Sequence, residues 1–257
     1  MSTDTPTRSR RPSLARAARA YGPSLIQRIF TARRRFVILT AGRSGSELLV
    51  DLLNSHPQIV CDGEILGTHR ALPERFVAAR AVLARLRGAE AYGFKLLREH
   101  VALQELGDPA SYLRRLHESG VRIILLERRD MVAQAVSFVR AAAGRYHYRR
   151  ADGVLFTPTR VDPMAVLATM YVLEEGVSFA RQALASIPHL RLVYEDHLSD
   201  SARHQPTADD ICNYLGLAPA PVRTELIRIT PRRTADQLEN FDEVVAALSA
   251  TRFAAYL

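Results

Sequence analysis

The fold is decided by the run Phe36-Val-Ile-Leu-Thr-Ala-Gly-Arg-Ser-Gly-Ser-Glu-Leu-Leu49, in which an apolar strand leads through a Gly/Ser loop into an apolar helix. This order places several unpaired backbone N–H groups at a helix N-terminus, around one point in space. The unpaired donors and the helix dipole together favour a negatively charged group there. Arg43 adds a side-chain cation within the loop. The run therefore predicts a phosphate-binding loop at the edge of a parallel sheet.

The spacing within this loop differs from that of two common nucleotide-binding fingerprints. A nucleoside-triphosphatase loop has Gly, four spacers and then Gly-Lys-Ser/Thr, whereas this loop is shorter and carries Arg43 in place of the lysine. The dinucleotide pattern Gly-x-Gly-x-x-Gly is also missing from the loop. The pattern therefore favours a phosphate carrier other than ATP or NAD. A Ser/Gly turn that only caps an ordinary helix is the alternative interpretation.

Composition indicates a globular protein with one core. The chain has 257 residues, of which 47% are hydrophobic, as is ordinary for a globular domain. It contains no apolar run long enough to span a bilayer and no apolar segment typical of a secretory signal. Cys61 and Cys212 lie far apart without metal-ligand spacing. We therefore expect buried thiols, no metal site and a reduced, cytoplasmic protein.

The charge pattern favours an anionic ligand. The formal net charge is +8, and Lys95 is the only lysine among 35 basic residues. Arginine presents a planar fork of donors that suits phosphate, although a genomic bias toward arginine codons explains the same imbalance. The single lysine, in Tyr92-Gly-Phe-Lys-Leu-Leu97, is therefore a candidate for a specific role.

The sequence divides into two regions of different character. Residues 1–34 form a basic extension, in which Ser13 to Arg35 has the pattern of an amphipathic helix that could contact an anionic membrane or nucleic acid; a solvated extension is the alternative. Residues 35–257 alternate between short apolar strands and helices, which predicts a single α/β domain with a parallel sheet and helices on both faces. The expected strands are 36–40, 92–97, 121–127 and 190–194, and the expected helices are 45–54, 73–87, 109–119, 130–143, 163–186 and 206–215.

A second strand-to-helix junction lies in Ile123-Ile-Leu-Leu-Glu-Arg-Arg-Asp-Met-Val-Ala-Gln-Ala-Val-Ser137. Arg128 and Arg129 follow a buried strand, at the end where open α/β sheets bind ligands. Ser137 lies about two turns into the next helix. An arginine fork and a hydroxyl could bracket one phosphate; a surface ion pair and a hydroxyl bonded to its own helix are the alternative. Together, the two junctions suggest a nucleotide with a 5′-phosphate and a 3′-phosphate.

These motifs resemble those of the PAPS-dependent sulfotransferases, where PAPS is 3′-phosphoadenosine 5′-phosphosulfate, and within them the bacterial carbohydrate-type members such as the nodulation-factor and trehalose enzymes. The resemblance covers roughly residues 36–257 and implies a P-loop-like fold. It implies that the loop around Arg43, Ser44, Gly45 and Ser46 holds the 5′-phosphosulfate. It further implies that Arg129 and Ser137 hold the 3′-phosphate.

The resemblance extends to later segments, with some departures. Tyr194-Glu-Asp-His-Leu198 is similar to a strand-end motif that lies near the adenosine in the family. The run Arg232-Arg233-Thr234 is similar to a basic loop that covers the 3′-phosphate in the family. Gly42 stands where a proline is usual, Glu47 where Thr or Asn is common, and His197 is inserted into the strand-end motif. These departures affect the finer phosphate contacts.

The expected chemistry is in-line sulfuryl transfer with a carboxylate base. The reaction needs a positioned acceptor hydroxyl, a base and cations near the leaving phosphate. Arg43 and Lys95 are the candidate cations, and the resemblance implies Glu64, in Asp62-Gly-Glu64, as the base. His56 is interpreted as a helix C-terminal cap rather than a base.

The acceptor is left open between a small-molecule carbohydrate and a glycolipid. Residues 140–152 are basic and aromatic, which suits a sugar headgroup, whereas a solvated basic loop explains them equally well. We expect no specific nucleic-acid partner, and peripheral membrane contact only through residues 1–34. The sequence does not specify an oligomeric state. The alternative function is a non-catalytic or diverged nucleotide-phosphate-binding protein.

Overall fold

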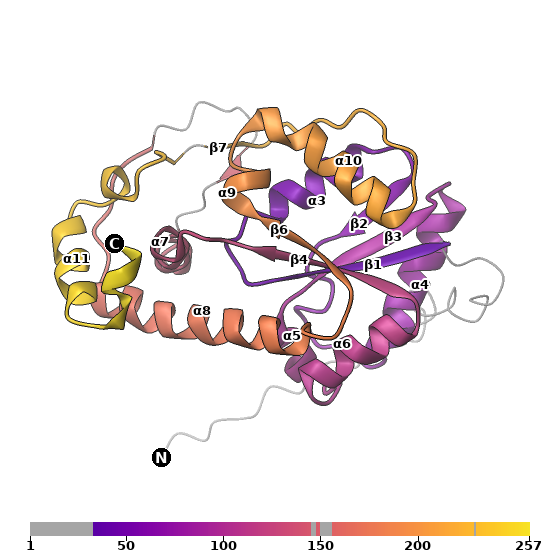
Figure 1. Cartoon of the computed structure of the whole chain (residues 1–257), viewed down its shortest axis with the longest axis horizontal. Helices are drawn as coiled ribbons and strands as arrows, with labels where there is room; N and C mark the ends of the chain where they lie inside the picture. The colour runs from indigo at the N-terminus through magenta and orange to yellow at the C-terminus, as the bar shows by residue number, and fades with distance from the viewer. Residues whose placement is uncertain (1–32, 145–147, 150–155, 229) are drawn as a thin grey trace, which may run out of the picture.

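The centre of the computed structural model is a five-stranded parallel sheet with the order β2-β3-β1-β4-β6 (Figure 1). The structure describes residues 33–144, 148–149, 156–228 and 230–257. The strands are β1 (Arg34–Thr40), β2 (Ile59–Asp62), β3 (Ala91–Leu96), β4 (Val121–Glu127) and β6 (His189–Val193). The four strands expected from the sequence are therefore confirmed, and β2 is an additional edge strand.

Each of the six expected helices is present in the expected order, and the described residues contain further short helices. The expected helices correspond to α3 (Ser46–Ser55), α4 (Pro73–Leu86), α6 (Pro109–Glu118), α7 (Met131–Ala142), α8 (Pro163–Ala183) and α10 (His204–Leu215). The additional helices are α5 (Arg98–Leu103), α9 (Tyr194–His197) and α11 (Phe241–Ser249). A two-stranded antiparallel pair joins β5 (Tyr148–Arg149) to β7 (Ile227–Arg228).

Local sequence explains where two of these helices begin. Pro109 and Pro163 occupy the first helical position, where the missing N–H costs nothing. The Asp108 side chain accepts a hydrogen bond from the Ser111 N–H at 2.8 Å, and the Asp162 side chain accepts one from the Met164 N–H at 2.9 Å. Both aspartates are therefore the N-caps that the sequence predicts.

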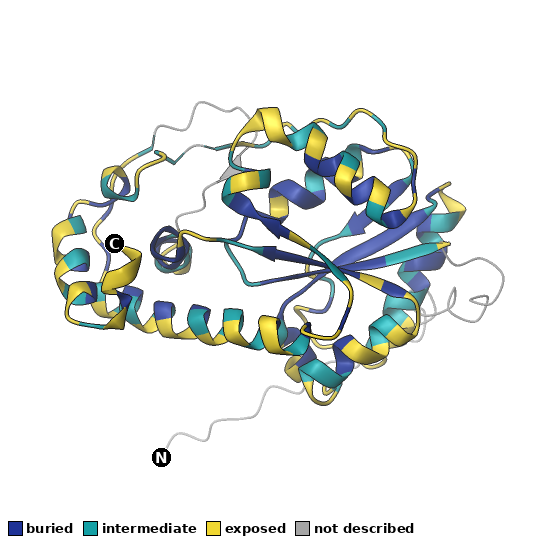
Figure 2. Cartoon of the chain, viewed as in Figure 1, coloured by how far each residue is buried: buried dark blue, intermediate teal, exposed yellow. Residues whose placement is uncertain are grey.

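Both faces of the sheet are covered, as expected for an α/β domain (Figure 2). Because side chains alternate along a strand, Phe36 and Ile38 of β1 pack with α3 and α10, while Val37 and Leu39 pack with α4, α6 and α8. A third cluster joins α7, α8, α11 and the C-terminal segment beyond the sheet. The described part of the chain is thus a single α/β domain.

Two expectations from the sequence concern segments that lie wholly or partly outside the described residues. The predicted amphipathic helix of the N-terminal extension falls almost entirely within residues 1–32, and six of the thirteen residues in the basic and aromatic segment 140–152 fall within residues 145–147 and 150–155. Among the described residues, no helix combines the length and the apolar character that crossing a bilayer requires.

Candidate functional site

The two predicted junctions lie side by side at one edge of the sheet. The chain runs from β1 to β2 and β3 on one side and later to β4 and β6 on the other. Open α/β sheets bind ligands at such a switch point, outside the carboxyl ends of the strands. Strands β1 and β4 are direct neighbours, and Thr40 pairs with Leu126 at their ends. The topology therefore brings the Arg43 loop next to the segment that follows β4.

The first loop is held in a backbone conformation that depends on glycine. Gly45 is the N-cap of α3 with a φ of 87°, and Arg43 also has a positive φ of 61°. A Cβ atom at Gly45 would lie 2.4 Å from Cδ2 of the Tyr194 ring. Tyr194 thus fixes the approach of the loop from the side of β6, while the N-terminus of α3 remains directed at the sheet edge.

A cavity of about 330 Å³ with a mostly polar lining lies in front of the N-terminus of α3. We call it the polar cavity. It is lined by Gly42, Arg43, Gly45, Ser46, Glu47, Glu64, Lys95, Leu97, Glu99, Arg128, Ala133, Ser137, Phe138, Tyr194, Arg228, Thr230 and Gln237. The lining therefore combines the first loop, the ends of β3 and β4, one face of α7 and the segment around β7.

Lys95 forms the centre of a charged cluster in this cavity. Its side chain is 3% exposed, and its ammonium contacts Glu47 and lies 2.9 Å from Oε1 of Glu64. The other oxygen of Glu64 faces Nε2 of His100 at 3.8 Å. The only lysine in the chain is thus buried between two carboxylates, one at the start of α3 and one after β2.

His100 presents a defined side of its ring to Glu64. The backbone N–H of Leu97 donates to Nδ1 of His100 at 3.3 Å, which assigns the proton of the neutral ring to Nε2. Burial lowers the pKa of His100 below its ordinary value, against the opposing effect of Glu64 and Glu99. A neutral imidazole therefore directs its N–H toward the carboxylate of Glu64.

The two junctions are connected by Arg43. Its Nε donates to Oγ of Ser137 at 3.0 Å, and the guanidinium of Arg128 donates to the carbonyl oxygen of Arg43 at 3.2 Å. The Arg128 guanidinium also lies over the Tyr194 ring, 5.1 Å from its centroid. One arginine side chain therefore spans the gap between the two predicted anion sites.

Three predicted arginines are placed differently from those that line the cavity. Arg129 is exposed and pairs with Asp196, and its backbone N–H donates to Glu195 at 2.9 Å. Arg232 and Arg233 are exposed as well. None of the three is among the lining residues, whereas Arg228 of β7 is. The structure brings together Arg43, Gly45, Ser46, Glu64, Lys95, Ser137 and Tyr194; Ser44 lies buried behind the loop.

Two departures from the expected motif have local explanations. A Cβ atom at Gly42 would lie 2.7 Å from Cζ of Phe138, so a larger residue at this position would require the Phe138 ring to move. Glu47 turns its side chain toward Lys95, and the Glu47 side chain is 58% exposed. Sequence reasoning did not anticipate this pairing or the role of His100, because both depend on contacts between separate elements.

Comparison with known proteins adds no independent assignment: no protein-family model matches the chain, and no curated protein matches it.

Proposed function

We propose that the protein transfers the sulfuryl group of PAPS to a hydroxyl of a carbohydrate or glycolipid acceptor. The observation that carries the proposal is the contact between buried Lys95 and Glu64 in a cavity onto which the N-terminus of α3 opens. That arrangement supplies a carboxylate base, a cation and backbone donors within one site. Sulfuryl transfer needs these three groups.

The first junction would hold the 5′-phosphosulfate in a P-loop-like manner. Arg43, Gly45 and Ser46, at the start of α3, all line the polar cavity. A helix N-terminus with an adjacent arginine favours a doubly charged group. Lys95 would stabilise the charge that develops on the leaving 5′-phosphate.

The second junction would hold the 3′-phosphate. Ser137 lines the polar cavity, whereas Arg129 lies outside that lining and pairs its exposed side chain with Asp196. Exposed ion pairs contribute at most about 1 kcal/mol to stability. Replacing the Asp196 carboxylate by a phosphate as the partner of Arg129 therefore costs little free energy. Arg232 and Arg233 lie in the segment between Thr230 and Gln237, two residues that line the cavity, and would close over the same phosphate.

Glu64 would act as the general base. As the acceptor oxygen attacks sulfur, Glu64 takes the hydroxyl proton, the new O–S bond forms, and the bond from sulfur to the 5′-phosphate oxygen breaks. The products are the sulfated acceptor and 3′,5′-ADP. Lys95 and the N–H of His100 orient the Glu64 carboxylate, which is 42% exposed and therefore accessible to an acceptor.

The test is transfer of label from sulfur-labelled PAPS to a panel of simple sugars and alkyl glycosides. Glu64→Gln is expected to lower turnover about a hundredfold or more and to leave binding of 3′,5′-ADP unchanged. Glu99→Gln is the matched control, because Glu99 lines the same cavity and lies outside the described contacts of Lys95. Equal turnover in the wild type and Glu64→Gln would remove Glu64 from the mechanism.

A non-catalytic nucleotide-phosphate-binding protein is the second candidate. Glu47 favours it, because a carboxylate in the first turn of α3 competes with the phosphosulfate for Lys95. This alternative predicts binding of 3′,5′-ADP without transfer to any acceptor. It also predicts that Glu47→Gln strengthens nucleotide binding without producing turnover.

A further inference from the structure

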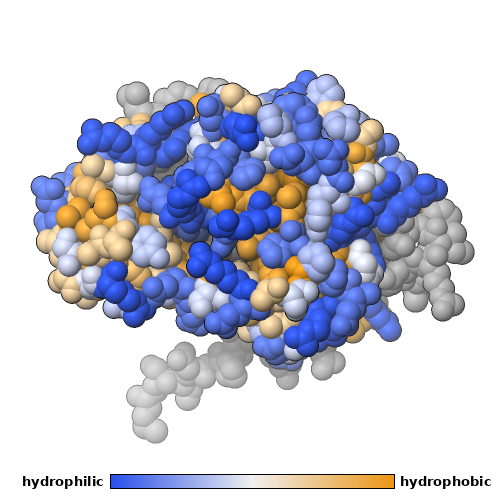
Figure 3. Space-filling view, viewed as in Figure 1, coloured by the Kyte–Doolittle hydropathy of each residue, from blue (hydrophilic) through white to orange (hydrophobic). Residues whose placement is uncertain are grey.

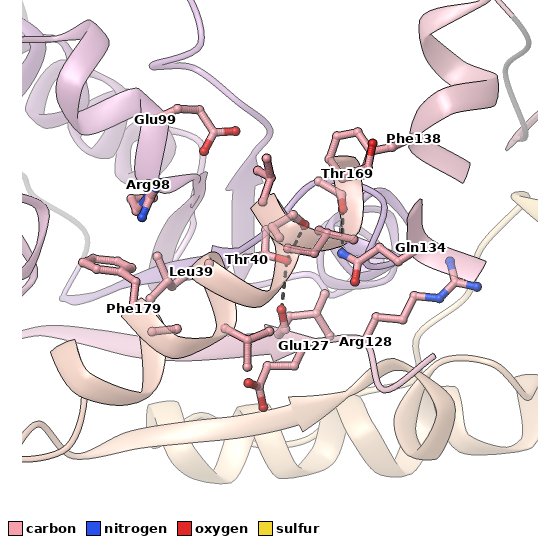
Figure 4. A pocket seen from close by; sticks show the side chains of 18 of the residues that line it. Leu39, Thr40, Arg98, Glu99, Glu127, Arg128, Gln134, Phe138, Thr169 and Phe179 are labelled. Carbon is pink, nitrogen blue, oxygen red and sulfur yellow. Dashed lines mark hydrogen bonds between the residues drawn. The ribbon is translucent and has the colours of Figure 1, made fainter. Parts of the chain in front are cut away.

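A second cavity lies beside the polar cavity and differs from it in character. It has a volume of about 360 Å³ and lies between the carboxyl ends of β1 and β4 and one face of α8 (Figure 4). We call it the apolar cavity. Its walls include Leu39 and Leu125 from the sheet and Leu173, Val177 and Ala180 from α8. The space-filling view shows hydrophobic surface between hydrophilic margins in the middle of the molecule (Figure 3).

The polar groups in the wall are already paired within the protein. The Thr40 hydroxyl donates to the Leu126 carbonyl at 2.9 Å, the Gln134 amide to the Gly42 carbonyl at 2.8 Å, and the Thr169 hydroxyl to the Ala165 carbonyl at 2.8 Å. A polar ligand would find few partners here. Apolar surface placed in the cavity is stabilised by its removal from water.

Two of the charged side chains at the margin form ion pairs, whereas Nε of Arg128, which also lines the cavity, is buried without a hydrogen-bond partner among the described residues. Arg98 pairs with Glu175 at 2.7 Å, and Glu127 pairs through Oε2 with Arg191 at 2.6 Å. Oε1 of Glu127 is buried and has no hydrogen-bond partner among the described residues. An anionic ligand group next to Glu127 is therefore disfavoured, because the buried carboxylate oxygen would repel it.

Gly176 contributes to the opening of the cavity. It lies inside the 21-residue helix α8, where glycine is destabilising relative to alanine. A Cβ atom at Gly176 would meet no atom within 4 Å, so close packing does not require glycine there. The residue leaves empty space on the face of α8 that lines the cavity.

The shape of the cavity suits an extended group. Its lining residues on α8 run from Ala168 to Ala180, which corresponds to about 18 Å of helix. The two cavities share Gly42, Glu99, Arg128 and Phe138 in their walls. The two cavities are therefore adjacent, and a molecule with its hydroxyl at Glu64 would extend past Phe138 to reach the apolar cavity.

We infer that the acceptor carries a linear hydrocarbon chain, which lies along α8 in the apolar cavity while the hydroxyl faces Glu64. This inference rests on the proposed function, and it selects the glycolipid class over the free sugar. The polar headgroup occupies the remaining part of the polar cavity, and the chain excludes water from the side of Phe138.

The experiment uses n-alkyl β-D-glucosides from methyl to decyl, below their micelle concentrations, titrated calorimetrically into the full chain with 3′,5′-ADP present. Affinity is expected to rise with chain length by up to about fourfold per methylene until the cavity is filled. Gly176→Leu should remove most of this dependence. Ser178→Leu adds the same side chain at an exposed position of the same helix and should leave the dependence intact.

Three outcomes would overturn the inference. The first is that all the alkyl glucosides bind with equal affinity, and the second is that Gly176→Leu leaves the dependence of affinity on chain length unchanged. The third is that phenyl β-D-glucoside binds as tightly as the decyl glucoside. The last result would assign the cavity to a compact ring. Titration of 3′,5′-ADP alone separates the two proposals. If 3′,5′-ADP binds but the affinity for alkyl glucosides does not change with chain length, only the inference of a hydrocarbon chain is contradicted. A chain-length dependence without 3′,5′-ADP binding contradicts the proposed function and supports the apolar site.

Discussion

The charged cluster at Lys95 predicts a strong energetic coupling between Glu47 and Glu64. The perturbation is the pair of substitutions Glu47→Gln and Glu64→Gln, made singly and together. Each single variant leaves the buried ammonium with one carboxylate. Since both glutamates are about half exposed, each single loss should cost about 0.5–1 kcal/mol, the upper part of the range for solvent-accessible pairs.

The double variant leaves the ammonium without a carboxylate among its described contacts, in a side chain that is 3% exposed. Removing the partner of a buried charge costs about 3–5 kcal/mol. We expect the lower end, about 3 kcal/mol, because water reaches the glutamate side of the cluster. The loss should therefore exceed the sum of the single losses by about 1–2 kcal/mol.

The assay is urea unfolding at neutral pH, supported by thermal unfolding. For a domain of this size the double variant should lower Tm by about 6–12 °C. Adding Lys95→Met to the double variant should restore most of the stability, because methionine fills the same space without a charge. Losses that add within about 0.5 kcal/mol, or no recovery with Lys95→Met, would refute the reasoning.

Three further predictions concern single residues. Gly45→Ala should destabilise the protein by at least about 1 kcal/mol more than Gly88→Ala. Both glycines have a positive φ, but only at Gly45 would an added Cβ atom clash with the Tyr194 ring. Equal losses of stability in urea unfolding would count against that contact. His100 has a lowered folded-state pKa, so the unfolded state binds more protons and stability should fall as pH drops below about 6.5. His100→Gln should reduce that fall between pH 7.5 and pH 5, and an unchanged pH profile would contradict it. Arg129→Ala should weaken 3′,5′-ADP binding about tenfold and leave 5′-AMP binding unchanged, as measured by calorimetry, whereas equal weakening of both would assign Arg129 a structural role.

The α/β fold follows from sequence because its signals are local. The strand, loop and helix of residues 36–49 are contiguous, and strands β3 and β4 are mostly buried and apolar, whereas β6 is apolar and buried only at its end, Leu192–Val193. Strand β2 was not predicted, because its four residues are too few to give a clear periodic signal. The Tyr194 motif was expected at a strand end, and it begins the short helix α9 directly after β6.

The site is less readable from sequence because its contacts are tertiary. Arg128 and Arg129 are adjacent and chemically equivalent in sequence, and only the backbone after β4 determines that Arg128 lines the polar cavity while Arg129 pairs with Asp196. Likewise, Glu47, Glu64 and His100 meet Lys95 or one another only after α3, β2, β3 and α5 have packed. Their pattern in the sequence carries no periodic signal for that cluster.

The central claim is that both strand-to-helix junctions bind one nucleotide with two phosphate groups. Calorimetric titration of the full chain with 3′,5′-ADP and, separately, with 5′-AMP tests it most directly, since the two ligands differ only in the 3′-phosphate. Preference for 3′,5′-ADP by at least about tenfold, equivalent to about 1.4 kcal/mol, is the predicted result. Equal affinity for the two nucleotides, or no binding of 3′,5′-ADP, would contradict the claim.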